Sequence, residues 1–144
     1  MSARGFTLVE VLITLGIFLL VSTVAVVVGL DSYQRVNFRS DVATAAALLQ
    51  KARSSAMSNV NEASHGVYFD NTAKQFVLFQ GNDYASRAPA QDVIIDFSKG
   101  VTVTVEEVVF TQLSGAATTD GGIEFSSNGQ PVTIEVNADG GINW

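Results

Sequence analysis

The residue whose chemistry stands out in this sequence is Glu10, a carboxylate inside an apolar stretch. The twenty residues from Val11 to Leu30 carry no charge, and this is about the length that a helix needs to cross a bilayer. A carboxylate within such a segment costs about 2.5–3.5 kcal/mol on insertion scales, so it is normally paired and marks a functional position. The alternative is that Glu10 lies at the depth of the lipid headgroups and has no role.

A partner for Glu10 would arise if the chain were cut between Gly5 and Phe6. The cut would create an α-amine on Phe6, so one chain would carry both members of an ion pair at the tip of an apolar helix. Within one helix these two groups are poorly placed to meet, whereas in staggered neighbouring helices they can meet. The pair would therefore specify assembly between chains.

The sequence GFTLVE at residues 5–10, preceded by Arg4, resembles the class III signal of type IV pilins and type II secretion pseudopilins. The resemblance implies cleavage after Gly5 by a prepilin peptidase, N-methylation of Phe6, and a role for Glu10 in filament assembly. It also implies an α+β pilin fold, in which a long N-terminal helix is transmembrane in its first half and packs with its second half on an antiparallel β-sheet head. The implied partners are other pilin or pseudopilin subunits and, indirectly, an assembly platform protein and its ATPase.

The charge distribution predicts the orientation of the membrane segment. Arg4 lies on the short N-terminal side, and positive residues stay in the cytoplasm, so we expect the head to lie outside the bacterial inner membrane before it joins a filament. An ordinary secretory signal has a shorter apolar core and a small-residue cleavage site after it, and neither is present here. A permanently membrane-anchored envelope protein remains an open alternative.

The sequence suggests four segments. We expect a leader peptide at residues 1–5, a transmembrane and filament-core helix at 6–30, an amphipathic continuation of this helix at 31–58, and a β-rich head at 59–144. With no proline before residue 89, the helix should be continuous. Its core-packing face is predicted by helical spacing and comprises Phe38, Val42, Ala45, Leu49, Ala52 and Ala56, widened by Leu48.

Beyond residue 61 the apolar pattern alternates with a period of two, which predicts six or seven antiparallel strands. Residues 66–69 and 76–79 should form a hairpin, and residues 123–125 and 132–136 another, joined by the Asn-Gly pair at 128–129. Residues 101–105 should form a strand that continues through 108–110. We expect the loops 80–91 and 112–122 to be variable surfaces.

A narrower resemblance covers two parts of the head region. The helix end LLQKARSSA at residues 48–56 and the turn FSSNG at residues 125–129 are similar to those of GspH/FimT-type minor pseudopilins. The chain has no cysteine, whereas many major pilins close a C-terminal loop with a disulfide. Both observations favour a minor subunit.

The charges of the head argue against DNA binding. The whole chain has a net charge of −6, but residues 59–144 carry three lysines and arginines against eleven acids, and residues 31–58 carry a net charge of +2. Affinity for the phosphate backbone comes from Lys and Arg, so a DNA-binding minor pilin is only an alternative. A basic stem and an acidic head could attract each other between subunits.

Other chemistry has little support. His65 is the only histidine, and we interpret it as a loop residue at the junction between helix and sheet. Turns near Asp120 and Asp139 could offer oxygen ligands to calcium, but they lack EF-hand spacing, and solvated turns explain them equally. We therefore predict no catalytic residue, no cofactor site and no metal site, and a protein that is not an enzyme.

Overall fold

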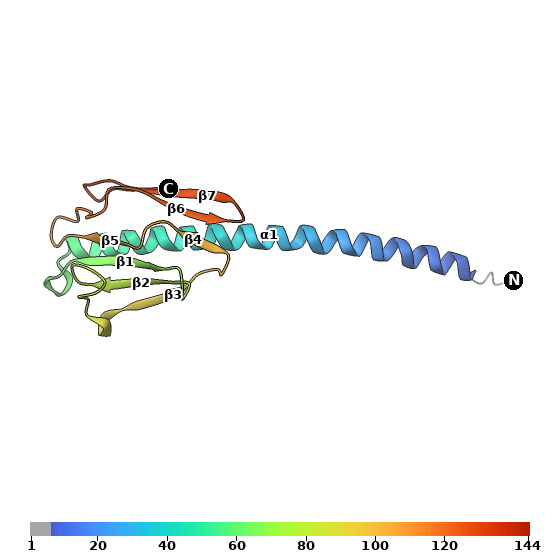
Figure 1. The fold of residues 1–144 in the computed structure, drawn as a ribbon, viewed down its shortest axis with the longest axis horizontal. Helices are drawn as coiled ribbons and strands as arrows, with labels where there is room; N and C mark the ends of the chain where they lie inside the picture. The colour runs from blue at the N-terminus through green and yellow to red at the C-terminus, as the bar shows by residue number, and fades with distance from the viewer. Residues whose placement is uncertain (1–6) are drawn as a thin grey trace. The chain divides into compact units, whose positions relative to one another are not determined.

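The computed structural model describes residues 7–144, except for the side chains of residues 24–32. The chain divides into two compact units, Met1–Asn37 and Phe38–Trp144. The predicted α+β class is confirmed, because a helix that begins near the N-terminus packs against antiparallel β-sheets, an arrangement consistent with the pilin fold (Figure 1).

The N-terminal element is a single helix, α1 (Leu8–Met57), of 50 residues. The predicted start at Phe6 lies outside the described residues, and the predicted end near Ser58 differs from the observed end by one residue. The helix continues through Gly16, as expected for a segment without proline, since proline would remove a backbone donor and kink it.

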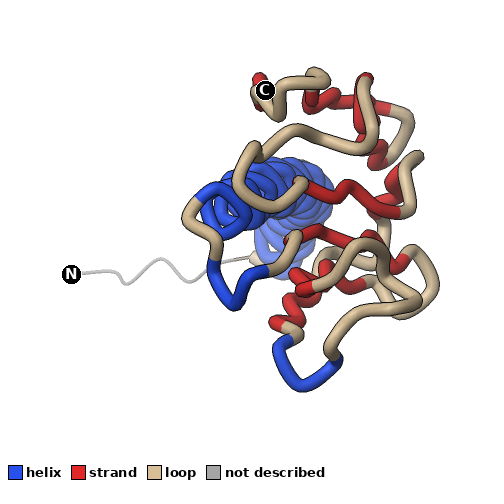
Figure 2. The backbone as a smooth tube through the Cα atoms, turned by 90° about the vertical axis from the view of Figure 1, so that its left-hand side faces the viewer, coloured by secondary structure: helices blue, strands red, loops and turns tan. Residues whose placement is uncertain are grey.

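Within the second unit, α1 contributes one face to the core. Every residue predicted for this face is buried, and so is Ala46. Figure 2 shows the strands to one side of the helix. The alanines at positions 45, 46, 52 and 56 lack bulk, so the sheets can approach the helix backbone closely.

The first sheet has the strand order β3-β2-β1-β5 and is antiparallel throughout. Its strands are β1 (His65–Asp70), β2 (Gln75–Gln80), β3 (Val93–Asp96) and β5 (Glu107–Phe110). The predicted β1–β2 hairpin is confirmed. Oδ1 of Asp70 accepts hydrogen bonds from the backbone N–H groups of Thr72 and Ala73, both at 2.8 Å, and this side-chain contact fixes the turn.

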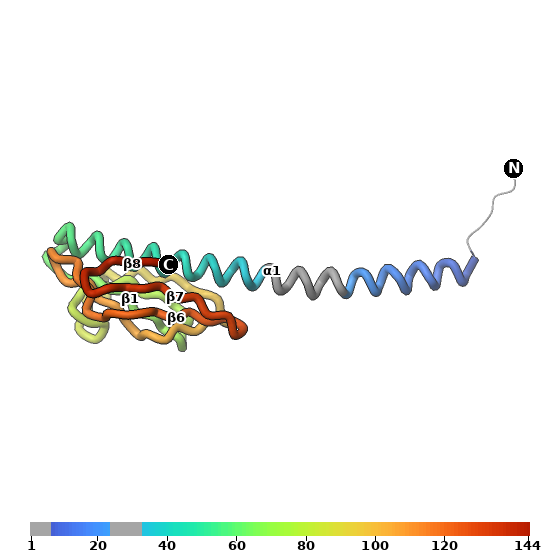
Figure 3. Tube along the Cα trace, turned by 90° about the horizontal axis from the view of Figure 1, so that it is seen from above, coloured from blue at the N-terminus to red at the C-terminus, as the bar shows by residue number. Residues whose placement is uncertain are grey.

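The second sheet has the order β4-β6-β7-β8. Its strands are β4 (Val101–Val103), β6 (Gly121–Ser127), β7 (Gln130–Val136) and β8 (Ile142–Asn143). The β6–β7 hairpin is the one that the Asn-Gly pair predicted, and Figure 3 shows the two strands side by side. Asn128 and Gly129 have φ values of 51° and 73°, the left-handed conformations that a two-residue hairpin turn requires.

One part of the strand prediction is wrong. The described residues form eight strands in two sheets, and β5 does not continue β4 but belongs to the other sheet. At the end of β4, the edge strand of its sheet, the side-chain amide of Asn71 takes the place of a neighbouring strand, because it accepts from the N–H of Val103 at 3.0 Å and donates to its carbonyl at 2.8 Å. The chain then changes sheet, and the N–H of Phe69 in β1 donates to the carbonyl of Glu106 at 2.7 Å.

Phenylalanines join the two sheets in the core. The ring of Phe69 in the first sheet lies 5.8 Å from that of Phe76 and 5.8 Å from that of Phe125 in the second, both edge to face. Phe97 stacks on Phe76 at 4.6 Å. Aromatic pairs in these geometries stabilise a core beyond the area they bury.

Two short 3₁₀ helices complete the fold, η1 (Val60–Glu62) and η2 (Pro89–Gln91). The first follows α1, where Asn59 and Asn61 adopt left-handed φ values of 55° and 54°. Asparagine tolerates this conformation better than most residues, so the turn predicted after Ser58 lies where the sequence indicated.

Candidate functional site

Gly5 and Phe6, the residues predicted for cleavage and N-methylation, lie outside the described residues. Glu10, the residue predicted for filament assembly, lies in the first turn of α1. The backbone N–H of Glu10 donates to Oγ1 of Thr7 at 3.3 Å, so Thr7 caps the helix, and its spacing from Glu10 matches a capping box. A carboxylate in the first turn is also favoured by the helix dipole.

The carboxylate of Glu10 has no hydrogen-bond or ion-pair partner among the described residues. The hydroxyls that follow in the helix do have partners, because each donates a hydrogen bond to a backbone carbonyl of the preceding turn. Thr14 donates to Glu10 at 2.9 Å, Ser22 to Phe18 at 2.7 Å, and Thr23 to Leu20 at 2.8 Å. Within residues 7–23, Glu10 is therefore the polar side chain whose bonding capacity is unused.

Large apolar side chains surround Glu10 on the helix and are exposed. More than half the surface of Leu8, Leu12 and Phe18 is accessible, at 76%, 61% and 69%, and the exposed apolar residues between 8 and 21 lie on all sides of the helix. A helix that is apolar all round belongs in a membrane or among other helices.

In the parts of the chain with described side chains, no helical stretch is both long enough and apolar enough to span a membrane.

Residues 1–26 match the family model of the prokaryotic N-terminal methylation motif. The matched segment includes Gly5, Phe6 and Glu10, and it supports a type IV pilin-like prepilin signal. A motif of this kind indicates processing by a prepilin peptidase, assembly with other pilin subunits, a membrane anchor, and a structural protein rather than an enzyme. Searches of curated proteins and of solved structures returned no match to the chain.

His65 is the first residue of β1 and not part of a loop. It is buried, and its Nδ1 lies 3.1 Å from the carbonyl oxygen of Ala63. Burial lowers the pKa of His65 below the ordinary 6.5, and the hydrogen bond to Ala63 opposes this shift only in part. His65 is thus a buried part of the junction between α1 and the first sheet.

Among the described residues, no three side chains of the His, Asp and Glu types lie together in a way that could hold a metal ion.

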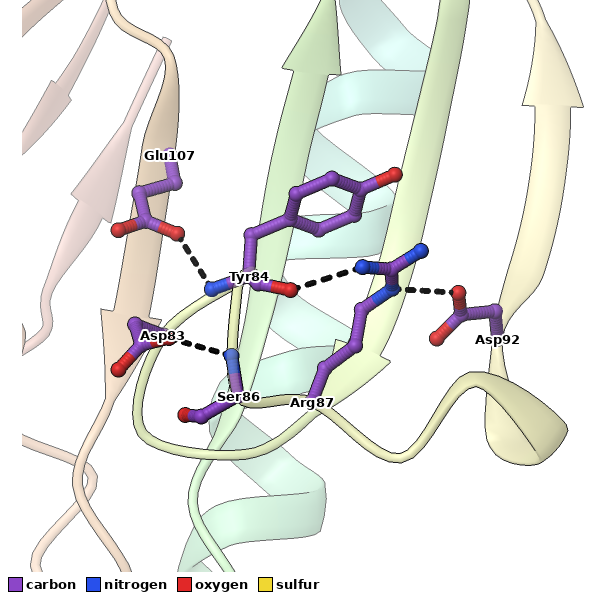
Figure 4. Close-up of polar contacts among 6 residues, drawn as sticks. All are labelled: Asp83, Tyr84, Ser86, Arg87, Asp92 and Glu107. Atoms are coloured by element: carbon purple, nitrogen blue, oxygen red, sulfur yellow. Dashed lines mark hydrogen bonds and ion pairs between the residues drawn. The ribbon is translucent and has the colours of Figure 1, made fainter.

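The loop after β2, which was expected to be a variable surface, is held in place by polar contacts (Figure 4). Arg87 donates from Nε to Asp92 at 2.8 Å and from Nη1 to the carbonyl of Tyr84 at 2.8 Å. Its guanidinium lies 3.8 Å from the centre of the Tyr84 ring, and the N–H of Tyr84 donates to Glu107 at 2.9 Å. The loop is therefore tied to the residue that precedes β3 and to β5 itself.

This loop covers the outer face of the first sheet. Tyr84 stacks on Tyr68, with ring centres 3.8 Å apart, and meets the edge of Phe79 at 5.6 Å. Gly66 lies opposite Phe79 in the sheet, and a Cβ there would lie 2.6 Å from its ring. Phe79 is consequently only 1% exposed, although it lies on the side of the sheet away from α1.

Arg53, near the end of α1, contacts two turns of the head, and the sequence analysis did not predict these contacts. Nη2 of Arg53 donates to the carbonyl of Asp139 at 3.1 Å. Beside it, Gly140 lies so close to Gly115 that a Cβ on Gly140 would be 1.9 Å from the Gly115 carbonyl oxygen. Arg53 belongs to the helix end that resembles that of the minor pseudopilins. Its neighbours in the sequence, however, do not indicate that it contacts Asp139, 86 positions away.

Proposed function

We propose that this chain is a structural subunit, of the minor class, of a type IV pilus or a type II secretion pseudopilus. In this proposal prepilin peptidase cuts after Gly5 and methylates Phe6. The mature subunit then assembles through its N-terminal helix, where Glu10 pairs with the Phe6 amine of a neighbouring subunit. The observation that carries the proposal is the unpaired carboxylate of Glu10 on an exposed apolar helix, within the residues that match the methylation motif.

The energetics support a role between chains. An unpaired carboxylate in an apolar medium is strongly destabilised, and the hydroxyls of Thr14, Ser22 and Thr23 already donate to their own helix. A cation from another chain would supply the missing partner. Removal of one member of a buried ion pair costs about 3–5 kcal/mol, enough to shift a subunit equilibrium by about two to three decades.

The proposal assigns a role to each segment of the chain. Residues 1–5 are the leader, residues 6–30 anchor the precursor in the inner membrane and later line the filament core, residues 31–58 continue the helix, and residues 59–144 form a head outside the cytoplasm. The platform protein and its ATPase act on the membrane-held subunit. The helix end at residues 48–56 and the absence of cysteine support a minor subunit of the GspH/FimT type.

The test is the chemistry of the mature N-terminus. Mass spectrometry of the purified chain should find N-methylated Phe6 as the first residue, and Gly5→Val should accumulate full-length precursor because a side chain obstructs the peptidase site. Gly16→Val is the matched control, since open space surrounds its Cβ within α1, and it should be processed normally. Normal cleavage of Gly5→Val would contradict the proposal, and a wild-type chain that retains Met1 would indicate a permanently anchored envelope protein.

A further inference from the structure

One margin of the first sheet is open. The strand order leaves β3 and β5 as the edges of this sheet, and Figure 1 shows β3 on its outside. A strand at an edge presents a row of backbone N–H and C=O groups that can pair with another strand. Whether β3 can do so depends on the direction in which each of its residues points these groups.

The register between β2 and β3 fixes these directions. The N–H of Phe97, directly after β3, donates to the carbonyl of Lys74 at 2.9 Å, and in an antiparallel pair such bonds recur at every second residue. The residues two and four positions before Phe97 therefore bond to β2. The N–H and C=O groups of Ile94 and Asp96, which alternate with them, point away from the sheet.

These outward backbone groups of Ile94 and Asp96 have no hydrogen-bond partner among the described residues. The side chains of the edge are accessible as well. Val93 is 43% exposed and Ile94 is 56% exposed, and they offer apolar surface on opposite faces because successive residues of a strand alternate. Within β3 no proline or lysine blocks the edge, and the carboxylate of Asp96, at its end, accepts from Gln75 at 2.9 Å.

The other edges of the two sheets are protected by the chain itself. At β5, the carbonyl of Val109 accepts from the N–H of Thr118 at 2.8 Å. At β4, the amide of Asn71 pairs with the backbone of Val103. The opposite edge of the second sheet is β8, of only two residues, beside a β7 that carries Pro131, and short strands and prolines both blunt an edge. Among the described residues, β3 has no protection of these kinds.

We infer that β3 receives an extended strand from the head of a different subunit, which adds to the first sheet beyond β3. The inference rests on the proposed function, in which a minor subunit has other subunits as its neighbours in a filament. The backbone identifies the kind of occupant. Outward donors and acceptors along an edge are matched by another strand, whereas the N–H and C=O groups of a helix already bond to one another.

A second copy of this chain is a poor occupant because of the charges on β3. In an antiparallel pair of two β3 strands, alignment of Ile94 with Ile94 would place Asp96 opposite Asp92, and alignment of Asp96 with Asp96 would oppose two carboxylates directly. The alignment between these would place Ile94 opposite Asp96. Like charges directly opposite destabilise a strand pair, whereas apolar pairs and opposite charges stabilise it. The strand that fits has an apolar residue opposite Ile94 and a cation opposite Asp96.

The experiment places a photoreactive diazirine amino acid at position 93 of the full chain, which leaves the outward groups of Ile94 and Asp96 intact. Membranes and sheared filaments are irradiated, and mass spectrometry identifies the peptide that is joined to position 93. We expect a peptide from the head of another filament protein that carries its own N-terminal methylation motif.

Variants of Ile94 in the same chain separate backbone pairing from side-chain contact. Ile94→Pro removes the outward N–H but keeps the ladder to β2, because an edge strand accepts proline where the N–H faces away from the sheet. It should lower the yield of the cross-linked product by about tenfold, since a hydrogen bond is lost and the ring obstructs the incoming strand. Ile94→Val is the matched control, which keeps the N–H and an apolar side chain and should leave the yield unchanged.

A further variant covers the case in which the proline variant fails to fold, as judged by circular dichroism. Ile94→Lys leaves the backbone as it is and places a charge on an exposed position of the edge. Because a lysine blunts an edge strand, it should also lower the yield of the product.

Three results would overturn the inference. They are a product that joins position 93 of two copies of this chain, a yield from folded Ile94→Pro or from Ile94→Lys equal to that from Ile94→Val, and filaments that contain the chain but give no product with another subunit. The mature N-terminus is measured in the same sample. Methylated Phe6 without a product from position 93 would leave the proposed function intact and reject the strand addition alone, whereas a chain that retains Met1 would reject the proposed function.

Discussion

Gly140→Ala should destabilise the second unit far more than a glycine replacement elsewhere with the same backbone conformation. Gly140 has φ of +78°, and a left-handed backbone costs an L-residue about 1–2 kcal/mol. The added Cβ would also lie 1.9 Å from the carbonyl oxygen of Gly115 and 2.9 Å from Nε of Arg53, so the turn must move away. The hydrogen bond from Arg53 to Asp139 would then be lost, at about 1.5–3 kcal/mol for a charged donor.

The expected loss for Gly140→Ala is thus about 2.5–5 kcal/mol, a large share of a typical stability of about 5–15 kcal/mol. Gly129→Ala is the matched control, because Gly129 has φ of +73° and open space where its Cβ would be. It should cost only the backbone part, about 1–2 kcal/mol. Urea unfolding of the full chain in detergent, followed by circular dichroism, measures both. Equal losses would refute the argument that the Arg53 and Gly115 contacts hold the turn.

Three further predictions concern other parts of the chain. Leu49→Asp should unfold the second unit, because Leu49 is 0% exposed and an unpaired buried carboxylate costs several kcal/mol; an unchanged melting temperature would contradict the core assignment. Glu10→Ala should leave membrane insertion and cleavage intact but lower the amount of this chain in sheared filaments, and equal amounts on immunoblots would remove the ion-pair mechanism. The stability of the chain should rise as the pH is raised toward 6.5, because burial lowers the pKa of His65 and the unfolded state therefore binds more protons there than the folded state; His65→Gln should flatten this part of the stability profile, and a wild-type profile without a rise would contradict the lowered pKa.

The sequence was sufficient where structure depends on local pattern. The spacing of Phe38, Val42, Ala45 and Leu49 predicted the buried face of α1, because every third or fourth residue of a helix points the same way. The Asn-Gly pair predicted the β6–β7 hairpin, because few residues other than these adopt left-handed turns at low cost. Each of these features depends on residues that lie close together in the chain, from Phe38 to Leu49 for the helix face and at 128–129 for the turn.

Features that depend on distant contacts were not predictable. Residues 101–110 alternate as one strand would, but β4 ends at Val103, where the backbone is paired by the amide of Asn71, 32 positions earlier. In the same way, nothing near Arg53 indicates that it meets Asp139. The prediction of the candidate site relied on residues 5–10, and of these the structure tests only the surroundings of Glu10, since Gly5 and Phe6 lie outside the described residues.

The position of the Thr7 cap bears on how the proposed maturation would proceed. The first helical turn depends on the hydroxyl of Thr7 and the backbone of Glu10, and a cut after Gly5 removes neither. Precursor and mature subunit would then share the same helix. In the precursor the helix would be preceded by the leader with Arg4, and in the mature subunit by Phe6 with its free α-amine. Maturation would require no refolding step, so a subunit could be stored fully folded in the membrane and made competent by covalent chemistry alone.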